Sequence, residues 1–134
     1  MKPLAGHRIL IFDQEWIVAH DLAVTFEKAG AQVIVASQVD EAVEIVRATK
    51  LTGAVLDTGK TGAECNCVEA HLRLQGVPII LHSCDAVPAR DGIVVVVKPI
   101  SADAIVAEMI RLARDAPAKP NTSFNGAGRD PRSA

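Results

Sequence analysis

The chain has 134 residues, of which 49% are hydrophobic and 22% are charged, and its formal net charge at pH 7 is −2. This length suits one domain with a single core, and this charge gives no electrostatic reason to expect binding to nucleic acid or to an anionic membrane surface. No apolar run is long enough to span a bilayer, and no apolar segment follows the charged N-terminus as it would in a secretory signal. Three cysteines, an odd number, indicate a reducing cytoplasm rather than a disulfide framework.

Short segments rich in Val, Ile and Leu alternate with amphipathic segments along most of the chain. The short segments lack a clean polar–apolar alternation, which is typical of strands covered on both faces in a parallel sheet. These predicted strands are residues 8–12, 32–36, 53–57, 77–83 and 92–97. Strand–helix repetition of this kind predicts right-handed crossovers and a doubly wound α/β fold. Five such strands predict a flavodoxin-like parallel sheet with the order 2-1-3-4-5.

Four full helices are predicted around this sheet. The first covers residues 15–29, and Gly30 follows as its C-terminal stop. The second opens at SQVD, residues 37–40, which has capping-box spacing. The third covers about 64–74, and the last begins near Ser101. The residues expected to face the core, helix by helix, are Val18, Leu22 and Phe26; Val39, Val43 and Val46; Val68 and Leu72; and Ile105, Met109 and Leu112.

Two further segments have their own signals. Only residues 84–91 remain to connect the fourth and fifth strands, whereas a crossover with its helix normally needs about 10–12 residues. We therefore expect the fourth helix of a five-helix arrangement to be shortened to about one turn or missing. Residues 116–134 hold little apolar content and no period, so we expect a folded domain over residues 1–115 and a disordered tail over 116–134.

Polar side chains stand at the C-terminal ends of four predicted strands. Asp13 follows the first strand and Asp57 ends the third, and these two strands flank the point where the strand order reverses. We therefore expect their carboxylates to face each other across a small acidic cleft. Two close carboxylates repel, which raises one pKa or demands a cation with a preference for oxygen ligands, such as Mg²⁺. Ser83 and Lys98 end the fourth and fifth strands and offer a hydroxyl and a positive charge to an anion that reaches Asp57.

The segments RILIFDQE, AVLD, VPIILHS and VVKPIS occur in this order and in this strand context, and they resemble the receiver domains of response regulators over roughly residues 7–114. The resemblance implies that Asp57 accepts a phosphoryl group from a phosphohistidine of a sensor histidine kinase or histidine phosphotransfer protein. It also implies that Ser83 hydrogen-bonds the phosphoryl oxygens and that Lys98 pairs with them.

The same resemblance implies a magnesium site made of Asp13, Asp57, Gln14 and the backbone of Gly59. It implies a bacterial, cytoplasmic signalling protein rather than an enzyme. Because no output domain follows in the chain, signalling would proceed by contact with a downstream protein partner, and a homodimer is one form such contact can take. Neither nucleic acid nor membrane is an expected partner.

Two positions depart from the family pattern. Receivers usually carry two adjacent acids after the first strand, whereas the second position here is Gln14, which brings no charge and should weaken Mg²⁺ binding. The family often has an aromatic residue where this chain has Val95, and valine cannot make the same rotation. Both departures favour an alternative interpretation as a pseudo-receiver, a phosphorylation-independent interaction module. The retained Asp57, Ser83 and Lys98 argue against it. A third interpretation is the terminal receiver of a hybrid kinase.

Other residues invite a second kind of chemistry. Cys65, Cys67 and Cys84 suggest a metal or thiol switch, but a CxC pair alone lacks the spacing of a structural zinc site, and we expect Cys65 to pack inward. Lys60 in TGKTG lacks the spacing of a nucleotide-binding loop.

Two aromatic side chains lie next to the expected site. His82 precedes Ser83 on a buried strand and is expected to be a core histidine with satisfied hydrogen bonds. Trp16 follows the acidic turn and is expected either to cover the pocket or to cover apolar surface.

Overall fold

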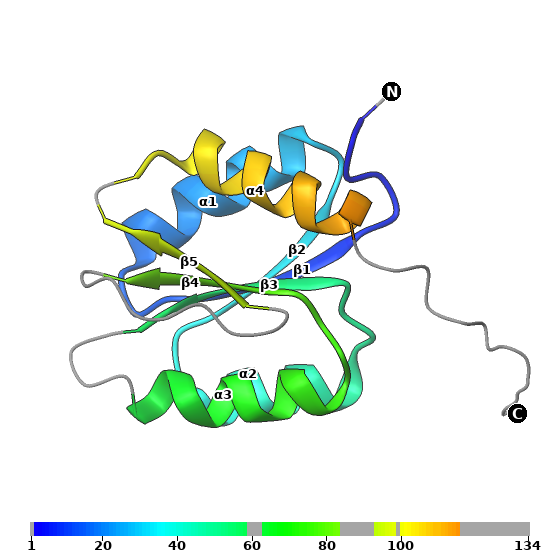
Figure 1. Ribbon diagram of the computed structural model, residues 1–134. Coiled ribbons are helices and arrows are strands. Elements are labelled where there is room, and N and C mark those ends of the chain that lie inside the picture. The colour runs from blue at the N-terminus through cyan, green and yellow to red at the C-terminus, as the bar shows by residue number, and fades with distance from the viewer. Residues whose placement is uncertain (1, 59–62, 84–92, 99, 116–134) are drawn as a thin grey trace, which may run out of the picture.

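The computed structural model describes residues 2–58, 63–83, 93–98 and 100–115. Within them a five-stranded sheet has the order β2-β1-β3-β4-β5, and every neighbouring pair is parallel (Figure 1). The strands are β1 (Arg8–Phe12), β2 (Gln32–Ala36), β3 (Gly53–Asp57), β4 (Ile79–Ser83) and β5 (Ile93–Val97). The predicted α/β fold and its strand order are confirmed. Only β4 differs noticeably, because it begins two residues later than expected.

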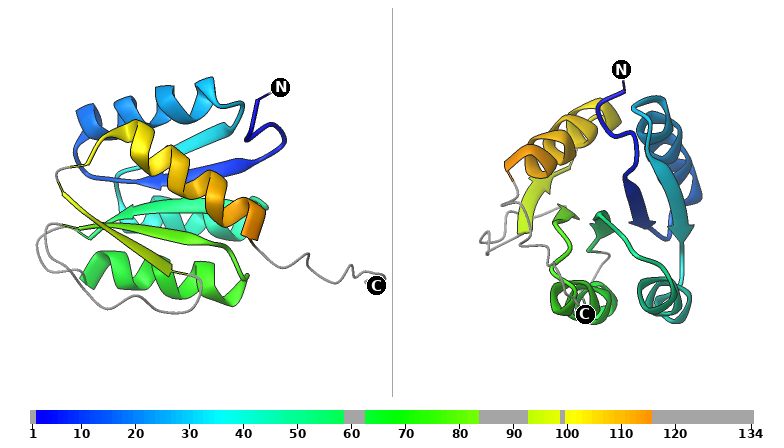
Figure 2. Two further views of the ribbon diagram at one scale, coloured as in Figure 1. Left: turned by 45° about the horizontal axis from the view of Figure 1, so that its top comes forward. Right: turned by 90° about the vertical axis from the view of Figure 1, so that its right-hand side faces the viewer.

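Helices cover both faces of the sheet (Figure 2). On one face lie α1 (Trp16–Lys28) and α4 (Ala102–Asp115), and on the other lie α2 (Val39–Ala48) and α3 (Ala63–Leu74). Successive residues of a strand point to opposite faces. Ile9 and Ile11 therefore belong to the apolar cluster beneath α1 and α4, whereas Leu10 and Phe12 belong to the cluster beneath α2 and α3. This arrangement explains why the strands are apolar without alternation.

The predicted core faces of the helices are largely confirmed. The expected residues that are buried are Leu22, Phe26, Val46, Val68, Leu72, Ile105 and Met109. Four others, Val18, Val39, Val43 and Leu112, are only half-buried. On α1 and α2 the buried positions next to them are taken by Ala19 and Ala42, which let each helix approach the sheet closely.

The expected stop of the first helix is confirmed, but the expected start of the second is wrong in detail. Gly30 has φ +102°, and the amides of Gly30 and Ala31 donate to the carbonyls of Glu27 and Phe26, which closes α1 in a left-handed turn. In α2 the N-cap is Gln38, which makes no side-chain capping bond. Because the helix begins one residue later than the capping box requires, the amide of Ser37 instead donates to Glu41 Oε1 at 3.1 Å.

Some expectations fall on residues that the structure does not describe. The shortened or missing helix between β4 and β5 falls within residues 84–92, the disordered tail covers 116–134, and Gly59 lies in the segment 59–62. Within the described part of the chain, no helix has the length and apolar character needed to cross a membrane.

Candidate functional site

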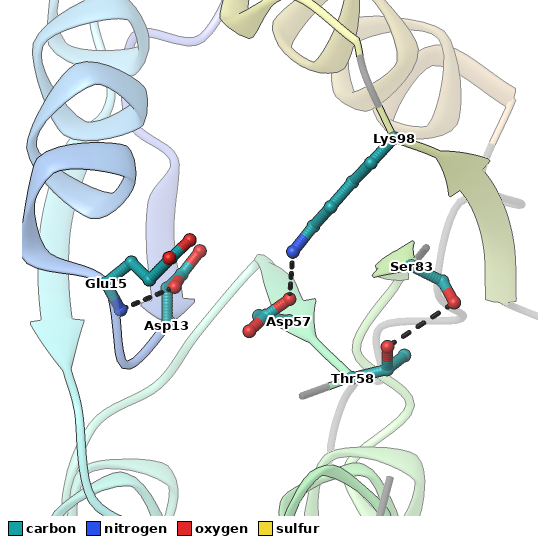
Figure 3. Close-up of polar contacts among 6 residues, drawn as sticks. All are labelled: Asp13, Glu15, Asp57, Thr58, Ser83 and Lys98. Carbon is teal, nitrogen blue, oxygen red and sulfur yellow. Dashed lines mark hydrogen bonds and ion pairs between the residues drawn. The ribbon is translucent and has the colours of Figure 1, made fainter. Parts of the chain in front are cut away.

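The site lies at the C-terminal ends of β1, β3, β4 and β5 and is centred on Asp57 (Figure 3). Lys98 Nζ lies 2.6 Å from Asp57 Oδ1, and the two side chains are 26% and 11% exposed. Charge-assisted hydrogen bonds of this length are stronger than neutral ones, and partial burial reduces their screening by water. The lysine predicted at the end of the fifth strand therefore neutralises the aspartate predicted at the end of the third.

Asp13 lies beside this pair, as expected from the strand order, and it is only 2% exposed. Its Oδ1 accepts a hydrogen bond from the amide of Glu15 at 2.8 Å, which folds the turn between β1 and α1 around the carboxylate. Burial raises the pKa of Asp13 above its ordinary value, and the charge of Asp57 raises it further, while the Glu15 amide and Lys98 oppose the rise. A negative charge at Asp13 is thus costly in this resting arrangement. A cation that contacts both carboxylates would relieve this cost.

The side chains around Asp57 suit a divalent cation that prefers oxygen ligands, but their total negative charge is small. Asp13 and Asp57 supply two carboxylates, and Lys98 already balances one of them. Gln14, the second position of the expected acidic pair, is exposed and contributes no charge. Among the described residues no group of three or more His, Cys, Asp or Glu side chains is arranged to hold a metal. The expected contribution of the Gly59 backbone lies outside the described residues.

Ser83 is buried at the end of β4, and its side chain is hydrogen-bonded to a residue that was not predicted to belong to the site. Thr58 Oγ1 donates to Ser83 Oγ at 3.3 Å (Figure 3). Thr58 directly follows Asp57, and its amide donates to the carbonyl of His82 at 3.3 Å. A hydroxyl residue next to the expected acceptor aspartate was the available signal. This signal was missed because the alternation of side chains along a strand does not show which residue of the neighbouring strand Thr58 contacts.

His82 is buried as expected, at 5% exposure, but the expectation of satisfied hydrogen bonds is wrong. Neither Nδ1 nor Nε2 has a partner among the described residues. Burial lowers the pKa of His82 below its ordinary value, and the charge of Lys98 lowers it further, against a smaller opposing effect of Asp57. The imidazole is therefore neutral near pH 7, with one donor and one acceptor nitrogen.

Trp16 is 74% exposed at the start of α1, so it covers little apolar surface, and it lines the same surface depression as Asp13. Val95 is half-buried against the core cluster beneath α2 and α3.

The cysteine hypothesis gains no geometric support from the described residues. Cys65 is buried in the core beneath α2 and α3, as expected, and Cys67 is exposed. His71, four residues after Cys67, forms a 3.0 Å hydrogen bond through Nδ1 to the backbone carbonyl of Cys67 rather than facing its thiol. Cys84 lies outside the described residues.

No family model matches the sequence, and no curated protein matches it. Solved structures do match. The receiver domain of a Francisella response regulator has a TM-score of 0.69 at 20% identity, over 84% of this chain and all of that one. The receiver domain of a Pseudomonas aeruginosa sensor histidine kinase, with magnesium coordinated in its active-site cleft, has a TM-score of 0.69 at 15% identity, over 83% of this chain and all of that one.

A third match is a Burkholderia pseudomallei response regulator that carries a phosphorylated aspartic acid and a calcium ion. Its TM-score is 0.64 at 19% identity, over 82% of this chain and 70% of that one. Identities this low establish the arrangement of the chain rather than its chemistry. The protein therefore has the fold of response-regulator receiver domains.

Proposed function

We propose that the protein is a receiver domain in a two-component phosphorelay and that Asp57 accepts the phosphoryl group. The observation that carries this proposal is the 2.6 Å contact between Lys98 Nζ and Asp57 Oδ1, beside the buried carboxylate of Asp13. Phosphoryl transfer depends chiefly on positioning and on neutralisation of charge around the transferred group. The site supports both, because the partly exposed carboxylate of Asp57 lies between the Lys98 ammonium and a second acid.

In the proposed reaction a carboxylate oxygen of Asp57 attacks the phosphorus atom of a phosphohistidine. The P–N bond breaks, its electron pair returns to the donor imidazole, and an acyl phosphate forms on Asp57. Asp13, Asp57 and an oxygen of Gln14 would hold Mg²⁺, and the backbone carbonyl of Gly59 is a further expected ligand. The ion would neutralise charge on the phosphoryl oxygens. Lys98 pairs with the phosphoryl oxygens, and the Ser83 hydroxyl donates to them.

The proposed donor is a sensor histidine kinase or a histidine phosphotransfer protein, and the proposed output is contact with a downstream protein. The neighbours with this fold include a sensor kinase's own receiver and response regulators, which supports a partner of this class. Residues 1–115 form the proposed receiver unit. The domain takes part in its own phosphorylation and is a signalling module rather than an enzyme acting on a separate substrate.

The direct test is incubation with acetyl phosphate and Mg²⁺ followed by intact mass measurement. In this reaction Asp57 attacks phosphorus and acetate leaves, so the expected product carries one phosphoryl group. The adduct should be absent from Asp57→Ala and present in Asp40→Ala, a matched control that removes an exposed aspartate in the first turn of α2. No adduct on the parent chain, together with Trp16 fluorescence that does not respond to Mg²⁺ and beryllofluoride, would overturn the proposal and favour a module that acts by contact alone.

A further inference from the structure

His82 carries two unpartnered ring nitrogens in a buried position. It is 95% buried, since its exposed fraction is 5%, and neither nitrogen has a hydrogen-bond partner among the described residues. Buried polar groups without partners are rare, and each loses the hydrogen bonds that it makes with water in the unfolded chain. A hydrophobic residue would fill this position of β4 without that loss. The imidazole is therefore available to a partner that reaches it in another state of the site.

The strand register places His82 between the strand that carries Asp57 and the strand that leads to Lys98. His82 pairs with Asp57 of β3 on one side and with Val96 of β5 on the other. Since β4 separates β3 from β5, the Lys98 side chain must cross the end of β4 to reach Asp57 (Figure 3).

His82 and Lys98 also share a face of the sheet. Ile80 and Val96 belong to the cluster beneath α1 and α4, and His82 and Lys98 lie two residues further along the same strands. Both side chains line one open groove of about 720 Å³ beside α1. The Lys98 side chain thus runs to the aspartate on the face of the sheet that carries the imidazole, close enough for its charge to lower the pKa of His82.

We propose that His82 is a positioning residue and an alternative hydrogen-bond partner of Lys98, to which the ammonium moves when the negative charge of Asp57 is removed or taken up by a cation. An ammonium group has three donors and no acceptor, so a donor released by the carboxylate needs another oxygen or nitrogen. A neutral imidazole provides such an acceptor on the same face of the sheet. The lowered pKa of His82 is consistent with this role, because it keeps one ring nitrogen unprotonated.

The consequence is a lysine with two defined positions. In the resting site Lys98 lies on Asp57, and after the charge of Asp57 is neutralised it lies on His82, where it stays within reach of an incoming anion. The exchange itself requires only these three side chains. Its role in phosphoryl transfer rests on the proposed function, so the two are tested separately.

The first test is long-range proton–nitrogen NMR of the four histidine rings, with the His82 signals assigned by their loss in His82→Gln. In the parent chain both His82 nitrogens should show shifts of a neutral ring that accepts no hydrogen bond. In Asp57→Ala the unprotonated nitrogen should move upfield as it accepts from Lys98, and this change should vanish in the double variant Asp57→Ala/Lys98→Met. Addition of Mg²⁺ to the parent should produce the same upfield change, without dependence on how well any variant folds.

Identical His82 signals in the parent with and without Mg²⁺ and in Asp57→Ala would overturn the inference. A change in Asp57→Ala that persists without the lysine would also overturn it, because the ring would then respond to something other than the ammonium.

The second test measures initial rates of phosphoryl incorporation. His82→Leu removes the acceptor at similar volume and should slow incorporation about five-fold, the equivalent of one lost hydrogen bond. His82→Gln retains an amide acceptor and should restore most of the parental rate. Equal rates for the two variants would exclude a hydrogen-bonding role. If the parent itself takes up no phosphate, the proposed function fails, whereas the NMR result still decides whether Lys98 moves to His82.

Discussion

The hydroxyl of Thr58 donates to Ser83 Oγ at 3.3 Å, which links the residue after Asp57 to the end of the neighbouring strand. Ser83 is buried, so its hydroxyl has a limited choice of partners, and this contact helps to set its orientation. In the proposed reaction the Ser83 hydroxyl must point at the phosphoryl oxygens. The resemblance to receivers assigns no role to Thr58, yet the Thr58 hydroxyl is placed to orient the Ser83 hydroxyl, to which the resemblance does assign a role.

Thr58→Val should therefore slow phosphoryl incorporation at Asp57. The loss of one hydrogen bond of about 1 kcal/mol corresponds to a reduction of about five-fold, and Ser83→Ala should cost more because it removes the donor itself. Initial rates with acetyl phosphate, followed by intact mass, provide the measurement. Thr25→Val is the matched control, since the Thr25 hydroxyl also donates a hydrogen bond, but to the backbone carbonyl of Asp21 within α1. A rate for Thr58→Val equal to that of this control would show that Ser83 needs no such orientation.

Gln14→Asp should tighten Mg²⁺ binding. A full negative charge added about 4 Å from a divalent ion in a water-like environment contributes about 2 kcal/mol, so an increase in affinity of about thirtyfold is expected. Trp16 follows this position by two residues and lines the same depression as Asp13, so its fluorescence can report the titration.

The control for this charge is Gln32→Asp, which adds the same charge at the start of β2, the opposite end of the sheet from the site. Equal affinities for Gln14→Asp and Gln32→Asp would mean that position 14 does not face the cation.

Asp13→Asn should stabilise the metal-free protein at pH 7, and the gain should depend on pH. The pKa of Asp13 is raised in the folded state, chiefly by burial, so its ionised form destabilises the folded protein relative to the unfolded chain. As the pH falls through the folded pKa toward 3.8, the folded protein takes up the proton first and the penalty disappears. The stability difference between variant and parent should therefore be positive at pH 7 and vanish below 3.8.

Urea unfolding in EDTA at several pH values measures this difference. The substitution keeps a side-chain oxygen that can still accept the Glu15 amide bond that Asp13 Oδ1 accepts in the parent, so the comparison isolates the charge. A difference that does not vary with pH would show that the carboxylate carries no electrostatic penalty.

Leu72→Ala should destabilise the fold by about 2–5 kcal/mol, because the side chain is fully buried in the cluster beneath α2 and α3 and its truncation leaves a cavity. Leu74→Ala is the matched control two residues later in α3, where the leucine is 86% exposed, and it should change stability by no more than about 0.5 kcal/mol. Chemical denaturation of both variants gives the comparison. Similar losses for the two would contradict the assignment of the inward face of α3.

Much of the fold could be predicted because its signals are local. The segments 8–12, 32–36 and 53–57 were predicted with the bounds of β1, β2 and β3, since strands covered on both faces have an uninterrupted apolar sequence. Gly30 marked the end of α1 because few other residues adopt its positive φ. Strand order then followed from the crossover rules, and with it the meeting of Asp13, Asp57 and Lys98 at one edge of the sheet.

Other features depended on which side chains meet across strands. The sequence placed His82 on a buried strand, but only the tertiary structure showed that its ring nitrogens lack a partner among the described residues and that Lys98 crosses β4 to reach Asp57. The contact between Thr58 and Ser83 is of the same kind. Periodicity and turn residues act within a few positions of the chain, whereas burial, partner and pKa are set by neighbours brought together from distant segments. The sequence by itself therefore determined the elements and their order, and the tertiary structure decided the chemistry around Asp57.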